Sequence, residues 1–586
     1  MEGSIWFSAF YGISFLMAVS GLYLYPKTEK KQNAVTWLPV SLFAVLCVQA
    51  LLGGVINLVG VPINLFTTGL IDLLFGIACW IWIFVQKKVQ SYKIHVVDLL
   101  VCVAVITTAV ICCLTQFSPD LLIHYETSDP GNHMKMAMNV INSQKLELMY
   151  FSGYCNAIFI EFFSPIFSSF TYFKLFILAD VVMFALSGMM FYAAVSHFLK
   201  THFARVAALI AVVLYMLGYP LNNMLFGFVY LGIGVSLVAF LLFAVNFFTK
   251  DNPCLVPAIV LLMLGVGGLI LCYSLFAPMV YIAVFAAVAW YYFRKKQLFK
   301  WKTVGIEFAI FLFPVIIGLI YSYFTYFGRS EDLTVGSALA AEGYIYRDLF
   351  SNFIYILPFT IFGLVTAIRR KEIGAGEFLF CGNFVLMVVQ YIMGLNDQIS
   401  SYYYYKQYYL MWLLAFYLGI KGIVFLAEKS RTAVVSYGVV WAFVMTMAFT
   451  GTDKQLNEDH LYFNTSVKSW SYLDVYKFNF DRMSDGDFSK VNSYLGLFRF
   501  VYDNLELSSQ VVPLVASQDY VYWYESITNQ RQSGYCVWNE GYQQKLLECN
   551  YVAVHAGSEA EADLEGLLSG CERVFENEFG YVVKIR

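Results

Sequence analysis

Residues 95–116 read HVVDLLVCVAVITTAVICCLTQ, a run that contains one acidic residue, Asp98, and is otherwise mostly apolar. A helix of about 20 mostly apolar residues is long enough to cross a lipid bilayer. The polar segment FSPDLLIHYETSDPGNHM follows at 117–134. The sequence therefore predicts a membrane-spanning helix that ends in a polar loop.

Thirteen further stretches have the same length and apolar character: 5–25, 35–60, 66–86, 172–196, 203–220, 223–248, 255–275, 277–293, 303–327, 352–368, 376–394, 407–427 and 433–450. Over the whole chain, 60% of the residues are hydrophobic and only 13% are charged. About a quarter of the residues of a soluble protein are charged. This composition excludes a soluble enzyme and a disordered chain, and the net charge of −3 gives no basic footprint for nucleic acid.

The end of the chain differs in composition from the rest. Residues 451–586 hold 11 Lys/Arg and 20 Asp/Glu, against 26 and 20 in residues 1–450. Strand patterns at 511–517 and 551–556, a helical pattern at 560–568 and a closing hairpin at 573–586 predict a small α/β domain. The fold class is therefore an α-helical polytopic membrane protein with about 14 spans and a C-terminal α/β domain.

The basic residues predict the orientation. The odd-numbered connections between the spans, with one adjoining helix end, carry 20 Lys/Arg, and the even-numbered connections carry 6. Cytoplasmic loops are the ones enriched in Lys and Arg. We therefore expect a multi-pass cell-membrane protein whose N-terminus and residues 451–586 are extracytoplasmic, with longer outer connections at 117–171, 328–351 and 395–406.

The first outer connection contains an acidic helix start. Asp129-Pro130 is typical of a helix N-terminus, with Asp at the cap and Pro at the first helical position. One interpretation is that Asp129 only caps this helix. The other is an acid–base site, in which a capping role would lower the pKa of Asp129 and favour Glu126 as the base. No metal or cofactor is certain, but Glu126, Asp129 and His133 could also hold a divalent cation, Mg or Mn.

The other outer connections supply candidate binding residues. The tyrosines at 402–405 fit an aromatic belt at the membrane interface, whereas Lys406, a single cation beside aromatic rings, suits a phosphate. Asp180, near the outer end of its span, is a buried-carboxylate candidate. The full set of substrate-binding candidates is His133, Lys135, Asp180, Arg329, Arg347, Tyr405 and Lys406.

This layout resembles the GT-C-fold glycosyltransferases of the bacterial type. SDPGNHMKMA at 128–137 is similar to the acidic-then-His openings of bacterial members, and SYYYYK at 401–406 to their aromatic-plus-Lys segment. The resemblance makes 95–450 the GT-C-like core, 1–94 an addition of accessory helices and 451–586 the outer domain.

The resemblance implies transfer of a sugar from a polyprenyl-phosphate donor, in the bilayer, to a glycan, lipid or protein acceptor on the outer face. The resemblance also implies that Asp129 or Glu126 is the catalytic residue. Two alternatives remain open. One is a transporter or flippase for a lipid-linked polysaccharide, which the number of spans favours and the lack of internal repeats disfavours. The other is a non-catalytic cell-surface assembly protein.

Overall fold

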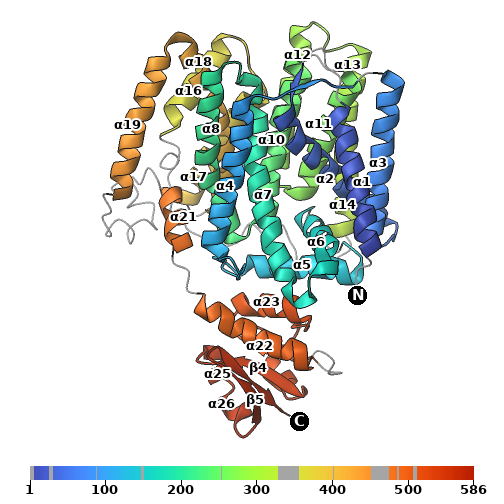
Figure 1. Cartoon of the computed structure of the whole chain (residues 1–586), viewed down its shortest axis with the longest axis vertical. Coiled ribbons are helices and arrows are strands. Elements are labelled where there is room, and N and C mark those ends of the chain that lie inside the picture. The colour runs from blue at the N-terminus through green and yellow to red at the C-terminus, as the bar shows by residue number, and fades with distance from the viewer. Residues whose placement is uncertain are drawn as a thin grey trace.

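The computed structural model of the chain is a helical bundle that carries a smaller domain at one end (Figure 1). The structure describes residues 5–25, 31–87, 89–146, 151–251, 254–326, 355–396, 398–399, 401–450, 474–484, 488–505 and 511–585. Within these ranges, 12 helical segments are long and apolar enough to cross a membrane. The chain is thus a multi-pass membrane protein of the predicted helical class.

The long helices of the first half of the bundle are α1 (Ile5–Leu24), α2 (Ala34–Leu58), α3 (Leu65–Gln86), α4 (Val96–Phe117), α7 (Tyr172–Val195), α8 (His202–Leu217) and α10 (Val229–Lys250). Those of the second half are α11 (Leu255–Cys272), α12 (Ala277–Arg294), α13 (Trp301–Glu307), η4 (Phe308–Leu312), α14 (Phe313–Tyr326), α16 (Leu357–Arg369), α17 (Ala375–Leu395), α18 (Ser401–Lys429) and α19 (Arg431–Thr450). Each of the fourteen predicted stretches coincides with helix in the described residues.

Short elements join these helices. They are β1 (Gln32–Asn33), β2 (Tyr92–Lys93), η1 (Ser164–Ile166), η2 (Ser169–Thr171), η3 (Ser196–Phe198) and α9 (Tyr219–Phe226). The boundary predicted between 203–220 and 223–248 lies a few residues later, because α9 continues to Phe226 and α10 begins at Val229, and Pro220 lies in the first turn of α9. A proline is tolerated in that first turn, where its missing N–H is not needed.

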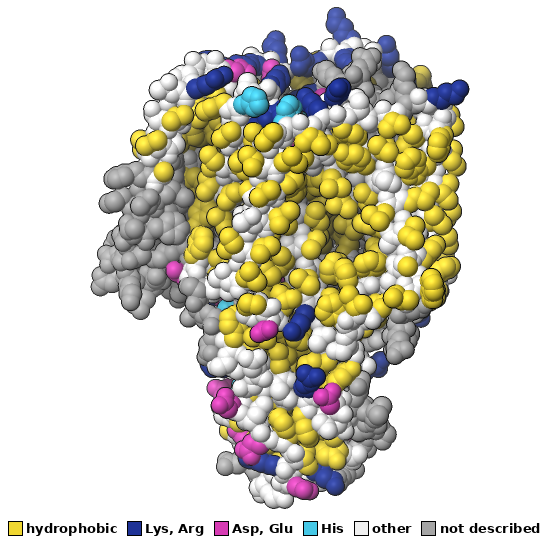
Figure 2. All heavy atoms as spheres, in the orientation of Figure 1, with side chains coloured by type: hydrophobic (Ala, Val, Ile, Leu, Met, Phe, Trp, Pro, Cys, Tyr) yellow, Lys and Arg dark blue, Asp and Glu magenta, His cyan; other side chains and the backbone are white. Residues whose placement is uncertain are grey.

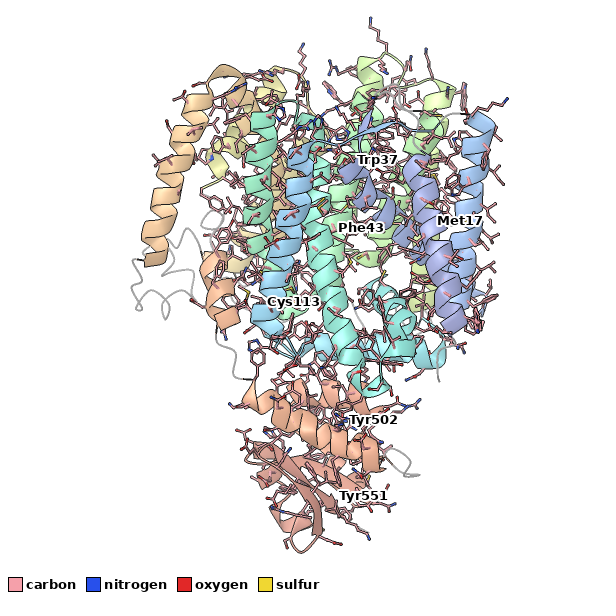
Figure 3. All side chains as sticks on the ribbon, viewed as in Figure 1. Met17, Trp37, Phe43, Cys113, Tyr502 and Tyr551 are labelled. Carbon is pink, nitrogen blue, oxygen red and sulfur yellow. The ribbon has the colours of Figure 1, made fainter. Side chains whose placement is uncertain are left out.

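Apolar side chains cover the middle of the face of the bundle seen in Figure 2. Figure 2 shows hydrophobic side chains over the middle of the bundle, with Lys and Arg gathered at the end opposite the smaller domain. The centre is filled by α10, which is hydrophobic all round and almost wholly buried. Trp37 of α2 packs edge-on against Phe243 and Phe247 of α10, with ring centroids 5.2 and 5.1 Å apart, and Figure 3 shows Trp37 and Phe43 within the helical part.

The C-terminal domain is a mixed sheet with helices on the side that faces the bundle (Figure 1). Its strands are β3 (Leu514–Val515), β4 (Tyr551–His555), β5 (Glu572–Glu576) and β6 (Gly580–Lys584), in the order β3-β4-β6-β5. Strands β3 and β4 are parallel and the other pairs antiparallel. The predicted strands and closing hairpin are confirmed, whereas the predicted helix 560–568 is two short turns.

The helices after the bundle are α21 (Asp474–Ser484), α22 (Ser489–Leu505), α23 (Gln518–Thr528), α24 (Tyr542–Leu546), α25 (Glu559–Ala562) and α26 (Glu565–Leu568). Helices α22 and α23 lie between the sheet and the bundle (Figure 1). The buried side chains of α22 include Val491, Tyr494, Leu495 and Phe498. This i, i+3, i+4, i+7 spacing gives α22 one apolar face.

Two helices of the predicted loop 117–171 lie where the bundle meets this domain. They are α5 (Asp129–Ser143) and α6 (Phe151–Phe163). Figure 1 shows α5 running across the ends of the membrane helices, directly above α23. The helix start predicted at Asp129-Pro130 is confirmed, because α5 begins there.

Candidate active site

The start of α5 is attached to the turn between α9 and α10. The backbone N–H of Glu126 donates to the carbonyl of Leu225 at 3.0 Å, and the hydroxyl of Thr127 donates to the carbonyl of Phe226, also at 3.0 Å. Gly227 follows with φ of +66°, and a Cβ atom there would lie 2.0 Å from Cγ of Pro130. A glycine is therefore required for Pro130 to pack here, and the Asp129 segment is fixed to the bundle.

The opposite side of α5 contacts the C-terminal domain. The Ser526 hydroxyl of α23 donates to the carbonyl of Gly131 at 3.1 Å, and Lys135 forms a 2.7 Å ion pair with Glu525. A Cβ on Gly131 would come within 2.9 Å of Cβ of Tyr522. Helix α5 is thus held between the helical bundle and the C-terminal domain. Lys135 points to the C-terminal domain, and a role for it in substrate binding stays a prediction.

Asp129 does not cap its helix. Ser128 occupies the cap position with φ −76° and ψ −16°, and Asp129 is the first helical residue. The prediction that capping lowers the pKa of Asp129 is therefore wrong. Burial raises the pKa of its carboxyl group, and the nearby Lys406 ammonium group opposes that rise. A carboxylate that burial destabilises is a stronger base than one that accepts backbone hydrogen bonds.

Lys406 lies in an aromatic cradle formed by α10 and its own helix α18. Its Nζ atom is 3.5 Å from the ring centroid of Phe228, 5.8 Å from that of Tyr230 and 6.0 Å from that of Tyr409. The residue is only 3% exposed. A cation that faces aromatic rings and is removed from water is held electrostatically by those rings, so the position of the ammonium group is well defined.

His133 joins the same group. It lies one helical turn after Asp129 on α5, and its ring centroid is 5.0 Å from that of Tyr230. Burial and the positive charge of Lys406 lower the pKa of His133 to about 4. The imidazole is therefore neutral at pH 7 and can offer a hydrogen bond but no positive charge. The structure thus brings Asp129, His133 and Lys406 together.

Glu126, the second candidate base, has a separate partner. Its carboxylate lies 3.3 Å from the guanidinium group of Arg482 on α21, and the two side chains are 14% and 48% exposed. Helix α21 is fixed nearby because the Asn479 amide donates to the carbonyls of Leu217 and Gly218 at 2.9 and 2.8 Å. Glu126 is therefore charge-neutralised, which separates it chemically from Asp129.

Asp180 of α7 lies near this site. The hydroxyl of Tyr125 donates to its Oδ2 atom at 2.8 Å. Its Oδ1 atom and the Oδ1 atom of Asn223 are buried without a hydrogen-bond partner in the described structure. Both residues line a cavity of about 30 Å³, together with Phe228, whose ring contacts Lys406. A cavity of this size accommodates water, so Asp180 stays a predicted binding residue for a small polar group.

The remaining candidates divide into two groups. Arg329 and Arg347 lie outside the described residues. Tyr405 is half-buried on α18, with its ring centroid 5.7 Å from that of Tyr404. Tyr404 and Tyr408 are fully buried in the protein, so these two rings fill the core and do not form a lipid-facing belt.

The residues that sequence reasoning missed are Phe228, Tyr230, Gly227 and Arg482. The first three lie within the predicted span 223–248, where aromatic residues and glycine are unremarkable, and Arg482 lies in a segment with no motif. Their positions near Asp129 and Glu126 follow from tertiary contacts alone.

A divalent cation does not fit the donor set. Among the described residues, no three His, Cys, Asp or Glu side chains gather as metal ligands. Glu126 is engaged by Arg482, and Asp129 lies beside the cationic Lys406, which would repel a metal ion. No step of the chemistry below is therefore assigned to a metal.

No protein-family model and no curated protein matches the chain. The fold is similar to a crystal structure of the oligosaccharyltransferase of Archaeoglobus fulgidus in the apo form, with a TM-score of 0.47 and 12% identity over 78% of this chain and 69% of that chain. A second crystal structure of that enzyme, tethered with an acceptor peptide containing the NVT sequon, gives a TM-score of 0.44 at the same identity and coverage.

Proposed function

We propose that the chain is a membrane glycosyltransferase that moves a sugar from a polyprenyl-phosphate donor to an acceptor hydroxyl at the junction of the bundle and the C-terminal domain. The proposal rests on the pairing of a half-buried carboxylate, Asp129, with a buried ammonium group, Lys406. General-base catalysis needs the first, and a phosphate leaving group needs the second.

The reaction assigns one role to each group. The acceptor hydroxyl oxygen attacks the anomeric carbon of the sugar and passes its proton to the Asp129 carboxylate. The bond between that carbon and the phosphate oxygen breaks, and the phosphate leaves with the electron pair. Lys406 stabilises the developing negative charge. Because Lys406 is 3% exposed, its field is screened less than it would be in water.

The chemical class of the donor is inferred from the side of the membrane on which the site lies. Figure 2 shows that Lys and Arg gather at the end of the bundle away from the site, which supports an extracytoplasmic site. Nucleotide sugars are cytoplasmic, so an activated sugar that reaches this face is carried by a lipid. A topology reporter fused behind residue 450 should be active only outside the cytoplasm, and a cytoplasmic signal would contradict this orientation.

Transfer from a labelled polyprenyl-phosphate sugar tests the catalytic assignment. Asp129→Asn keeps the shape of the side chain but removes its basicity, so the rate should fall by about 10²–10⁴. Asp120→Asn changes an exposed carboxylate of the same loop and should leave the rate unchanged. Glu126→Gln should have a small effect because Arg482 already neutralises Glu126.

Transfer by Asp129→Asn at the parent rate would refute the proposal. The same reconstituted vesicles also test the alternative class, since a transporter or flippase would move the labelled lipid across the bilayer without transferring its sugar.

A further inference from the structure

A second polar site lies at the opposite end of the bundle. A cavity of about 1140 Å³ is formed where the ends of α7, α10, α12 and α18 meet the segment around β1. It lies at the end where Figure 2 shows the gathering of Lys and Arg, away from the C-terminal domain. None of the candidate active-site residues lines it.

The wall of this cavity has an excess of positive charge. Eight Lys and Arg residues line it against four Asp and Glu residues. Three of the four carboxylates already have partners. Asp98 lies 3.7 Å from Arg205, Asp251 lies 3.0 Å from His197, and Glu428 lies 2.9 Å from Arg370. Three of the four acidic side chains of the wall therefore lie beside a basic side chain.

Five lysines of the wall form no ion pair with a carboxylate of the described residues: Lys31, Lys93, Lys200, Lys250 and Lys295. Lys93, Lys200 and Lys250 are among them and are exposed. Lys250 is positioned over the ring of Phe198, 4.5 Å from its centroid. These ammonium groups come from the ends of three different elements, so the fold gathers charges that repel one another.

Arg205 provides a fixed donor in the same wall. The residue is 9% exposed, and its Nε and Nη2 atoms donate to the carbonyl of Leu199 at 3.3 and 3.1 Å. Its buried Nη1 atom lies 3.7 Å from Oδ1 of Asp98, so the guanidinium group is held in the wall by this carboxylate and by the Leu199 carbonyl.

We propose that this cavity binds a ligand through its phosphate group. Arg donates to phosphate oxygens in a planar fork, and Lys contributes compact charge. The phosphate could belong to a phospholipid headgroup of the adjacent leaflet or to a soluble molecule. Basic pockets between membrane helices bind anionic headgroups, and Trp290 and Tyr291 in the same wall suit the interface. The site is separate from the proposed catalytic centre.

Binding to the purified full-length protein tests this proposal with two probes. Inorganic pyrophosphate represents the soluble source, and phosphatidylcholine vesicles with and without phosphatidic acid represent the lipid source. The triple variant K93Q/K200Q/K250Q should weaken binding by about 10- to 100-fold. The matched control is K296Q/K371Q/K429Q, which removes three exposed lysines at the same end that do not line the cavity.

The outcomes distinguish specific binding in the cavity from non-specific attraction to the basic surface. Loss of affinity in the cavity variant alone supports the proposal, with pyrophosphate or phosphatidic acid identifying the source of the phosphate. An equal loss in both triple variants, or no saturable binding of either probe by the parent, overturns it. If the cavity variant does not fold, K200Q alone, at an exposed lysine, should still lower the affinity, and an unchanged affinity would overturn the proposal.

Discussion

Pro130 packs directly against Gly227, so closely that a Cβ atom on Gly227 would lie 2.0 Å from Cγ of the proline. This contact joins the start of α5, one residue after Asp129, to the turn between α9 and α10. On the same side of that turn, Phe228 contacts Lys406. One glycine therefore sets the relative position of the two groups to which catalysis is assigned.

Replacing Gly227 with alanine should both destabilise the protein and slow sugar transfer. The alanine would have to adopt a left-handed φ of +66° and would also displace Pro130. We expect a loss of about 2–4 kcal/mol, measured as a lower thermal unfolding midpoint in detergent. Because a displacement of about 1 Å costs a reaction roughly 10²-fold, the transfer rate should fall by a similar factor.

Gly60→Ala is the matched control for this variant. Gly60 also has a positive φ, +80°, but a Cβ there would meet nothing within 4 Å. Gly60→Ala should therefore lower the unfolding midpoint only by the cost of the backbone strain and should leave the transfer rate unchanged. Equal effects of the two substitutions on the transfer rate would show that the contact with Pro130 is unimportant.

The ion pair between Lys135 and Glu525 should couple α5 to the C-terminal domain. Lys135→Glu should lower the unfolding midpoint, and Lys135→Glu combined with Glu525→Lys should recover part of the loss. We expect a coupling free energy of roughly 0.5–1 kcal/mol for this partly exposed pair. The same swap of Arg573 and Glu576, which are both exposed, should give almost none. A coupling for Lys135–Glu525 no larger than this control would mean that other contacts hold α5.

The spans and the terminal hairpin could be predicted because their signals are local. Hydrophobicity over about 20 residues defines α4, predicted at 95–116 and observed at Val96–Phe117. Alternating apolar residues and the turn at Asn577 define the pair β5–β6. The ion pair between Glu126 and Arg482 joins residues 356 positions apart and leaves no local pattern. The prediction of Asp129 at the cap is wrong by one residue, because Ser128 occupies that position.

The lowered pKa of His133 makes the stability of the protein depend on pH. The folded chain holds this histidine with a pKa of about 4, whereas an unfolded histidine has a pKa of about 6.5. The folded state therefore binds fewer protons in this window, so its stability is greatest above pH 6.5 and falls as the pH is lowered towards 4.

Replacing His133 with phenylalanine should reduce this loss, measured as the unfolding midpoint at pH 7.5 and at pH 4.5. The new ring could keep the contact with Tyr230 while it removes the titrating group. His202→Phe, at an exposed histidine of the far face, should leave the pH dependence of the parent. A parent and a His133→Phe variant that lose equal stability on acidification would exclude His133 as a contributor.

Lys406 should act on Asp129 as well as on the leaving phosphate. Its positive charge lowers the pKa of Asp129, so Lys406→Met should raise that pKa and move the acidic limb of the pH–rate profile to higher pH. The loss of phosphate stabilisation should lower the rate at every pH, by about 10²–10³. Lys406→Arg keeps the charge and should restore the position of the acidic limb, with only part of the rate because the guanidinium group has a different shape. Lys490→Met, at an exposed lysine of α22, should change neither quantity. A Lys406→Met enzyme with a lower rate but an unshifted acidic limb would separate the two roles and show that Asp129 is not the group that titrates in catalysis.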